Sequence, residues 1–124
     1  GLVGAYSMSL FGWGFATGGI WGFDLGTAWE LSENGKVLDE QKFNYSCQDV
    51  DLSVRFAKAG YTVTHVPGIE YGDNPYIVHA VSQTGLALHG SEEALRRLRA
   101  PERKAFLDKH GRKDGRPLYE GVEE

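Results

Sequence analysis

Cysteine is nearly absent from this chain: Cys47 stands alone, so no disulfide can form within it. A lone cysteine fits a reducing compartment, and we expect a cytoplasmic protein. No apolar run reaches the roughly 18 residues that a membrane span requires. Long basic blocks are also missing and the net charge is −4, which argues against nucleic acid and anionic membrane surfaces as main partners.

Glycine and aromatic residues are plentiful near the start. Residues 2–25 are apolar and glycine-punctuated, which predicts one or two extended core segments with a loop at residues 12–14. The chain opens without an initiator Met or the basic start of a signal peptide, so we expect the interior of a domain. Thr27 is predicted to cap a short helix over residues 28–32, with Glu30 completing a capping box. A hairpin around Asn34-Gly35 is the alternative.

The most informative stretch is YSCQDVDLSVRFAKAGY, residues 45–61. Ser46 and Asp49 have capping-box spacing, which predicts a helix over residues 48–58. Leu52 and Phe56 are four residues apart, so they should share one buried face. Gly60 is the expected end of this helix.

The remainder alternates between strand and helix signals. Ser91 is predicted to cap one helix, and Pro101 to start another that Gly111 ends. The other expected elements are strands at residues 61–66 and 69–71, a turn at Pro67-Gly68, a helical segment over residues 76–88, and a polar tail over residues 112–124.

Asp49 and Asp51 allow two interpretations. In the structural one, Asp49 caps the helix and Asp51 forms a modest surface ion pair with Arg55, four residues on. In the functional one, an ionised Asp49 at the lip of a loop accepts a proton from a substrate hydroxyl. The pair also spells D-x-D, a string that holds metal-bound nucleotides elsewhere. Residues two apart on a helix point to different faces, so we do not interpret it as a metal site.

The run also resembles the GT-A glycosyltransferase superfamily, chiefly its inverting family 2. That family carries an aromatic loop and an Asp-Glu pair, then Glu-Asp-x-Asp-Leu, a short helix with Arg, Ala-Gly-Tyr and a β-branched strand ending in Pro. The resemblance covers residues 15–111 and includes a tail similar to Phe-x-x-Lys-Trp-Gly at residues 105–111. The matching positions are Thr17 to Ile20, Leu38 to Glu40, Tyr45, Gln48 to Leu52, Arg55 and Lys58 to Pro67.

The resemblance implies an α/β fold, the C-terminal, acceptor-binding half of a GT-A domain, with a mixed sheet and flanking helices. It implies that Asp49 is the catalytic base in sugar transfer from a nucleotide-sugar donor to an acceptor hydroxyl. Asp39 and Glu40 would shape the acceptor loop. Gln48 stands where the family has Glu, a residue that commonly contacts the acceptor. The aromatic residues expected as surfaces for sugar stacking are Tyr45, Trp21 and Trp13.

A metal ion is also implied. Asp73 occupies the position where the family often has a metal-binding His, and an oxygen ligand there suits Mg²⁺ or Mn²⁺. His79, nearby in sequence, is a second candidate ligand, although a lone His is more often structural.

Residues 1–111 would form the acceptor-side part of the domain, followed by the tail at 112–124. The nucleotide-binding half expected from the resemblance is absent, so we expect a homo-oligomer or docking to that missing half. A non-catalytic binding or assembly module that keeps part of the fold is the main alternative. An unrelated small α+β protein, in which Asp49 and Asp51 only cap and pair, is a third interpretation.

Overall fold

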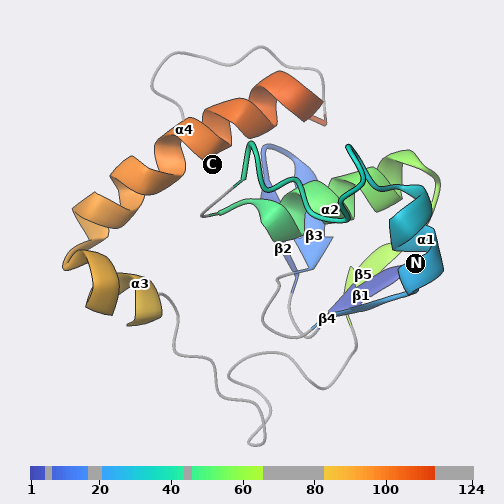
Figure 1. Ribbon diagram of the computed structural model, residues 1–124, viewed down its shortest axis with the longest axis horizontal. Coiled ribbons are helices and arrows are strands. Elements are labelled where there is room, and N and C mark those ends of the chain that lie inside the picture. The colour runs from blue at the N-terminus through green and yellow to red at the C-terminus, as the bar shows by residue number, and fades with distance from the viewer. Residues whose placement is uncertain (5–6, 17–20, 44–45, 66–82, 114–124) are drawn as a thin grey trace, which may run out of the picture.

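A computed structural model describes residues 1–4, 7–16, 21–43, 46–65 and 83–113 (Figure 1). These ranges contain five strands and four helices. In chain order they are β1 (Leu2–Gly4), β2 (Ser7–Leu10), β3 (Trp13–Ala16), β4 (Trp21–Phe23), α1 (Leu25–Glu30), α2 (Gln48–Lys58), β5 (Val63–His65), α3 (Gln83–His89) and α4 (Glu92–His110).

The strands form a mixed three-stranded sheet and a separate hairpin. The sheet has the order β4-β1-β5, with β1 antiparallel to β4 and parallel to β5. Strands β2 and β3 form the hairpin, whose turn lies at Phe11-Gly12 rather than at residues 12–14. Both turn residues have positive φ, 51° and 83°, as a two-residue hairpin turn requires. The prediction of an α/β chain with a mixed sheet and flanking helices is confirmed.

Helix α2 is the centre of the core. Leu52 and Phe56 are both fully buried and pack in one apolar cluster with Leu2. Val50 and Val54 belong to a second cluster, which brings together residues far apart in sequence: Leu10, Phe11, Phe43, Cys47 and Phe106. The predicted helix over residues 48–58 and its buried pair are therefore confirmed. Gly60, with φ of 92°, follows the end of α2 as expected.

Helix α1 begins earlier than the sequence indicated. Asp24, not Thr27, is its N-cap, because the Asp24 carboxylate accepts hydrogen bonds from the Thr27 N–H and hydroxyl, both at 2.8 Å. Asn34-Gly35 does form a turn, and the flanking Glu33 and Lys36 exchange backbone hydrogen bonds. Only that single pair is bridged, so this segment forms a turn after a helix rather than a longer hairpin.

Helix α4 is one helix where two were predicted. Ser91 caps it, accepting from the Ala94 N–H at 3.1 Å, and Gly111 ends it with φ of 70°. Pro101 lies inside, where the loss of an N–H costs about 3 kcal/mol. Buried Leu95 and Phe106 lie on either side of Pro101, so tertiary packing holds both halves of the helix and offsets this cost.

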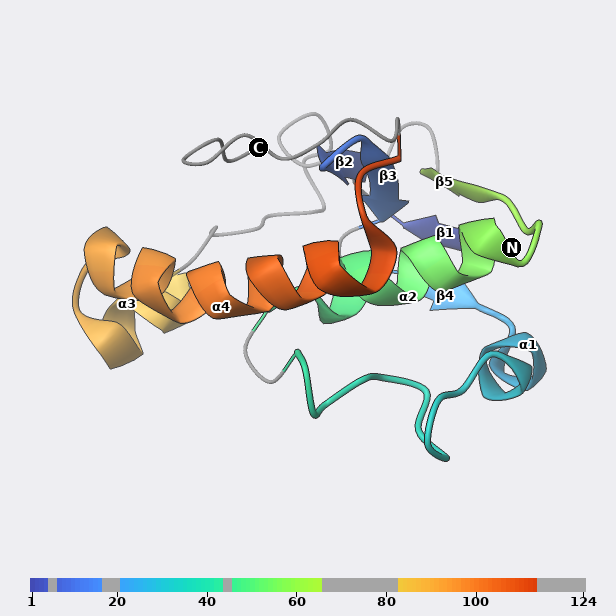
Figure 2. The same cartoon turned by 90° about the horizontal axis from the view of Figure 1, so that it is seen from above.

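The other elements agree with the predictions in part. Strand β5 lies inside the expected 61–66, and α3 extends one residue beyond the expected 76–88; residues 69–71 and 76–82 fall outside the described residues. Figure 2 shows α3 and the first half of α4 extending away from the sheet, while the end of α4 lies beside α2. Among the helices of the described ranges, none is long and apolar enough to cross a membrane.

Candidate functional site

Asp49 lies in the first turn of α2, as predicted, but the contacts around it differ from those predicted. Cys47, with φ of 67°, is the N-cap and makes no side-chain capping bond, so the predicted capping box is wrong. The Ser46 hydroxyl and N–H instead donate to Glu102 on α4, at 3.1 and 3.0 Å. Gln48 and Asp49 are half-buried, and one Asp49 carboxylate oxygen accepts the Val50 N–H at 2.9 Å.

Asp51 has a different environment, because it is fully buried. Its carboxylate contacts three basic side chains: His110 Nε2 at 2.6 Å, Lys109 Nζ at 2.9 Å and Arg55 Nε at 3.1 Å. The prediction of a surface ion pair with Arg55 was right about the partner and wrong about the location. Burial alone would raise the pKa of Asp51, but the bonds from His110 and Lys109 and the charge of Arg55 hold that pKa below its ordinary value.

Lys109 lies among three carboxylates. Its Nζ is 2.6 Å from Glu33, 3.0 Å from Asp39 and 2.9 Å from Asp51. Burial opposes the charge of Lys109, but bonds to Glu33, Asp51 and Asp39 outweigh it and raise its pKa. The pKa of Asp39 is lowered, since the Lys109 and Lys42 hydrogen bonds outweigh the effect of burial. We call Asp51, Asp39, Glu33, Arg55, Lys109 and His110 the buried ion network.

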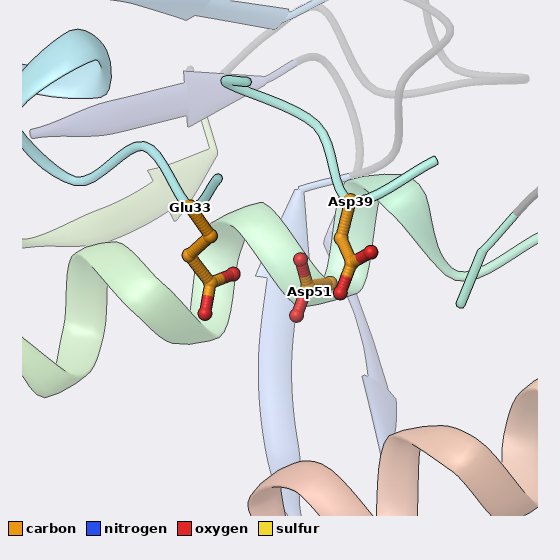
Figure 3. Close-up of side chains that lie close together, drawn as sticks. All are labelled: Glu33, Asp39 and Asp51. Carbon is orange, nitrogen blue, oxygen red and sulfur yellow. The ribbon is translucent and has the colours of Figure 1, made fainter. Parts of the chain in front are cut away.

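A metal ion is not needed to hold these acids together. Figure 3 shows Glu33, Asp39 and Asp51 pointing toward one another, and their ligand atoms lie within 4.8 Å of one another. Three carboxylates at this spacing are a donor set that suits a hard divalent cation. The Lys109 ammonium bonds to all three, however, so it supplies the positive charge that a cation would supply.

Arg55 connects the network to the segment before α2. Its guanidinium donates to the backbone carbonyls of Leu31, at 2.9 Å, and Val37. Together with Lys109, it fixes three parts of the chain to one another: α2, residues 31–39 and the end of α4. The first turn of α2 is therefore bonded to the segment that leads to Asp39.

The remaining predicted site residues are scattered. Asp39 is in the network, while Glu40 is exposed and pairs with Lys36 at 2.9 Å. A small hollow over residues 33–41 is lined by Asp39 and Glu40 among others. Trp21 is half-buried, with its ring edge-on to Phe23 at 5.3 Å, so much of its surface serves the core.

Tyr45, Asp73 and His79 lie outside the described residues. The sequence did not indicate that Glu33 belongs to the buried ion network. Lys109 and His110 were noticed only as part of residues 105–111, which resemble the family's tail, and no role was predicted for either. The only signal was that Lys109-His110 belongs to the stretch that resembles the family.

Comparisons with protein-family models, curated proteins and solved structures found no match for this chain.

Proposed function

We propose that this chain is the acceptor-side part of an inverting glycosyltransferase of the GT-A kind, similar to family 2, with Asp49 as the general base. One observation supports this above all: the two acids of Asp49-Val50-Asp51 have separate environments. Asp51 is fully buried and bonded to three basic side chains, so it serves the fold. Asp49 is half-buried in the first turn of the same helix, where the helix dipole stabilises a negative charge.

In the proposed reaction, the Asp49 carboxylate takes the proton from an acceptor hydroxyl. The hydroxyl oxygen then forms a bond to the anomeric carbon from the side opposite the nucleoside diphosphate, whose bond to that carbon breaks. The configuration at the anomeric carbon is therefore inverted. A carboxylate in this role supplies a typical general-base acceleration of about 10²–10⁴-fold.

The acceptor would lie between the start of α2 and the segment around residues 39–43. Asp39, Glu40, Gln48, Tyr45 and Trp21 are the residues we assign to acceptor binding. The buried ion network supports this assignment, because it fixes α2 against the Asp39 segment through Lys109. A base held in place by such packing loses less of its catalytic effect to misorientation.

The donor sugar and its diphosphate would bind mainly to the nucleotide-binding half that the resemblance implies. Mg²⁺ or Mn²⁺ would neutralise the departing diphosphate, with Asp73 and His79 as the proposed ligands from this chain. The Glu33, Asp39 and Asp51 cluster is not proposed for this ion, because Lys109 already bonds to its three carboxylates.

The test is Asp49→Asn in a polypeptide that also carries the nucleotide-binding half. The amide keeps the size of the side chain but cannot take up the proton, so transfer should fall by about 10²–10⁴-fold, or roughly 3–5 kcal/mol of barrier. Binding of the nucleotide sugar, measured by calorimetry, should change little. Asp108→Asn, at an exposed position on α4, is the matched control. Near-normal turnover of Asp49→Asn would show that this acid only supports the helix.

A non-catalytic assembly module is the second candidate, and one observation favours it. Leu25 and Trp29, four residues apart on α1, are 69% and 60% exposed. Such a pair suits contact with another protein surface better than contact with water. Light scattering of the isolated chain over a concentration series tests this candidate, and substitution of Trp29 by Ala should weaken any self-association that it detects.

A further inference from the structure

Lys58 and His110 extend the buried ion network to the protein surface. Lys58 is exposed at the end of α2, and its Nζ lies 2.8 Å from His110 Nδ1. The His110 side chain is only 3% exposed, and its other nitrogen, Nε2, is 2.6 Å from Asp51. A surface cation, a buried imidazole and a buried carboxylate are thus joined in one chain of hydrogen bonds.

The hydrogen-bonding capacities of Lys58 and Asp51 select one tautomer of His110. An ammonium group only donates hydrogen bonds and a carboxylate only accepts them. Nδ1 must therefore accept from Lys58, and Nε2 must carry the hydrogen that it donates to Asp51. The reverse arrangement, with a neutral amine beside an imidazolium, is unfavourable because an amine in water holds its proton about four pH units longer than an imidazole.

The charges around His110 balance when Lys58 is counted with them. Glu33, Asp39 and Asp51 contribute three negative charges, and Arg55 and Lys109 contribute two positive ones. The remaining negative charge is balanced through the imidazole by Lys58. An aromatic ring lies beside each group: the Phe106 ring is 5.0 Å from the His110 ring, and the Trp13 ring is 5.6 Å from Lys58 Nζ.

We propose that Lys58 is an electrostatic switch for the buried ion network. While its ammonium is present, His110 stays neutral. When that charge is removed, Nδ1 takes up a proton from solvent and the imidazolium becomes the third cation beside Asp51. Any change that neutralises Lys58 at the surface, such as acylation of its amine, thereby alters the charge beside the buried Asp51 carboxylate, which holds α2 and α4 together. This inference does not depend on the role of Asp49.

The test is ¹⁵N NMR of the histidine rings in the isolated chain at pH 6, where a free imidazole is about three-quarters charged. In the wild type, His110 should show one protonated and one bare ring nitrogen. Lys58→Met should raise the ratio of charged to neutral His110 at least about tenfold, the usual effect of removing a like charge at this range. Lys58→Arg, which keeps the charge, should leave His110 mostly neutral.

Two controls make the result specific. Lys36→Met removes an exposed lysine that pairs with Glu40, away from His110, and should change nothing at His110. His89, on α3, should give the same signal in every variant. A charged His110 in the wild type at pH 6 would overturn the proposal on its own, whatever the folding of the variants. An unchanged ratio in folded Lys58→Met would overturn it equally.

Discussion

Replacing Asp51 with Asn should destabilise this protein far more than the same change at Asp49. The amide removes the negative charge that Lys109, Arg55 and His110 share in a fully buried position. Removing one partner of a buried ion pair typically costs 3–5 kcal/mol, because the opposite charges stay buried. The free energy of unfolding of a small domain is about 5–15 kcal/mol in total, so the loss should be a fifth or more of the stability.

The assay is urea unfolding of the isolated chain, followed by tryptophan fluorescence. Asp49→Asn is the matched control, with the same substitution two residues away on the same helix. It should cost less than about 1 kcal/mol, the usual contribution of an acid to a helix N-terminus. If Asp51→Asn costs no more than Asp49→Asn, the buried ion network does not hold α2 to α4 and the reasoning fails.

Further predictions follow from the same contacts. The pKa values of Asp51 and Asp39 are lowered, so the stability they contribute should be complete above about pH 5 and be lost as pH falls below about 4, as urea midpoints across pH would show. The pKa of Lys109 is raised, so the stability that Lys109 contributes should be complete below about pH 10 and be lost above it. A free energy of unfolding that stays constant above about pH 10 would contradict this. Pro101→Ala should stabilise the chain by about 1–3 kcal/mol, since it restores a backbone donor within α4, and an unchanged urea midpoint would argue against a continuous helix. Light scattering should show an oligomer in concentrated solution, and a well-behaved monomer would count against assembly through α1 or the sheet edges.

The features predicted correctly from the sequence depend on neighbouring residues. The extent of α2, its end before Gly60, the Ser91 cap and the stop at Gly111 all follow from spacings of a few residues. Physical effects that act within one or two helical turns decide such features. Local patterns therefore carry enough information to predict them.

Three of the errors have one physical cause: partners distant in sequence. Ser46 has an appropriate capping position, but Glu102, 56 residues later, binds its hydroxyl. Asp51 looked like a surface residue because Lys109 and His110 are 58 and 59 residues away. Pro101 should have divided a helix, yet packing of Leu95 and Phe106 holds the two halves in one. No pattern in a single chain predicts these long-range contacts.

The central claim is that Asp49 and Asp51 have separate roles, with Asp51 held as a permanent anion within the fold. Its most direct test is ¹³C NMR of the aspartate carboxyl carbons in the isolated chain as pH is lowered. We predict that the Asp51 signal keeps its ionised shift well below pH 3.9, the ordinary aspartate pKa, until the protein unfolds in acid. An Asp51 carboxyl that takes up a proton at or above pH 3.9 in the folded protein would contradict the account.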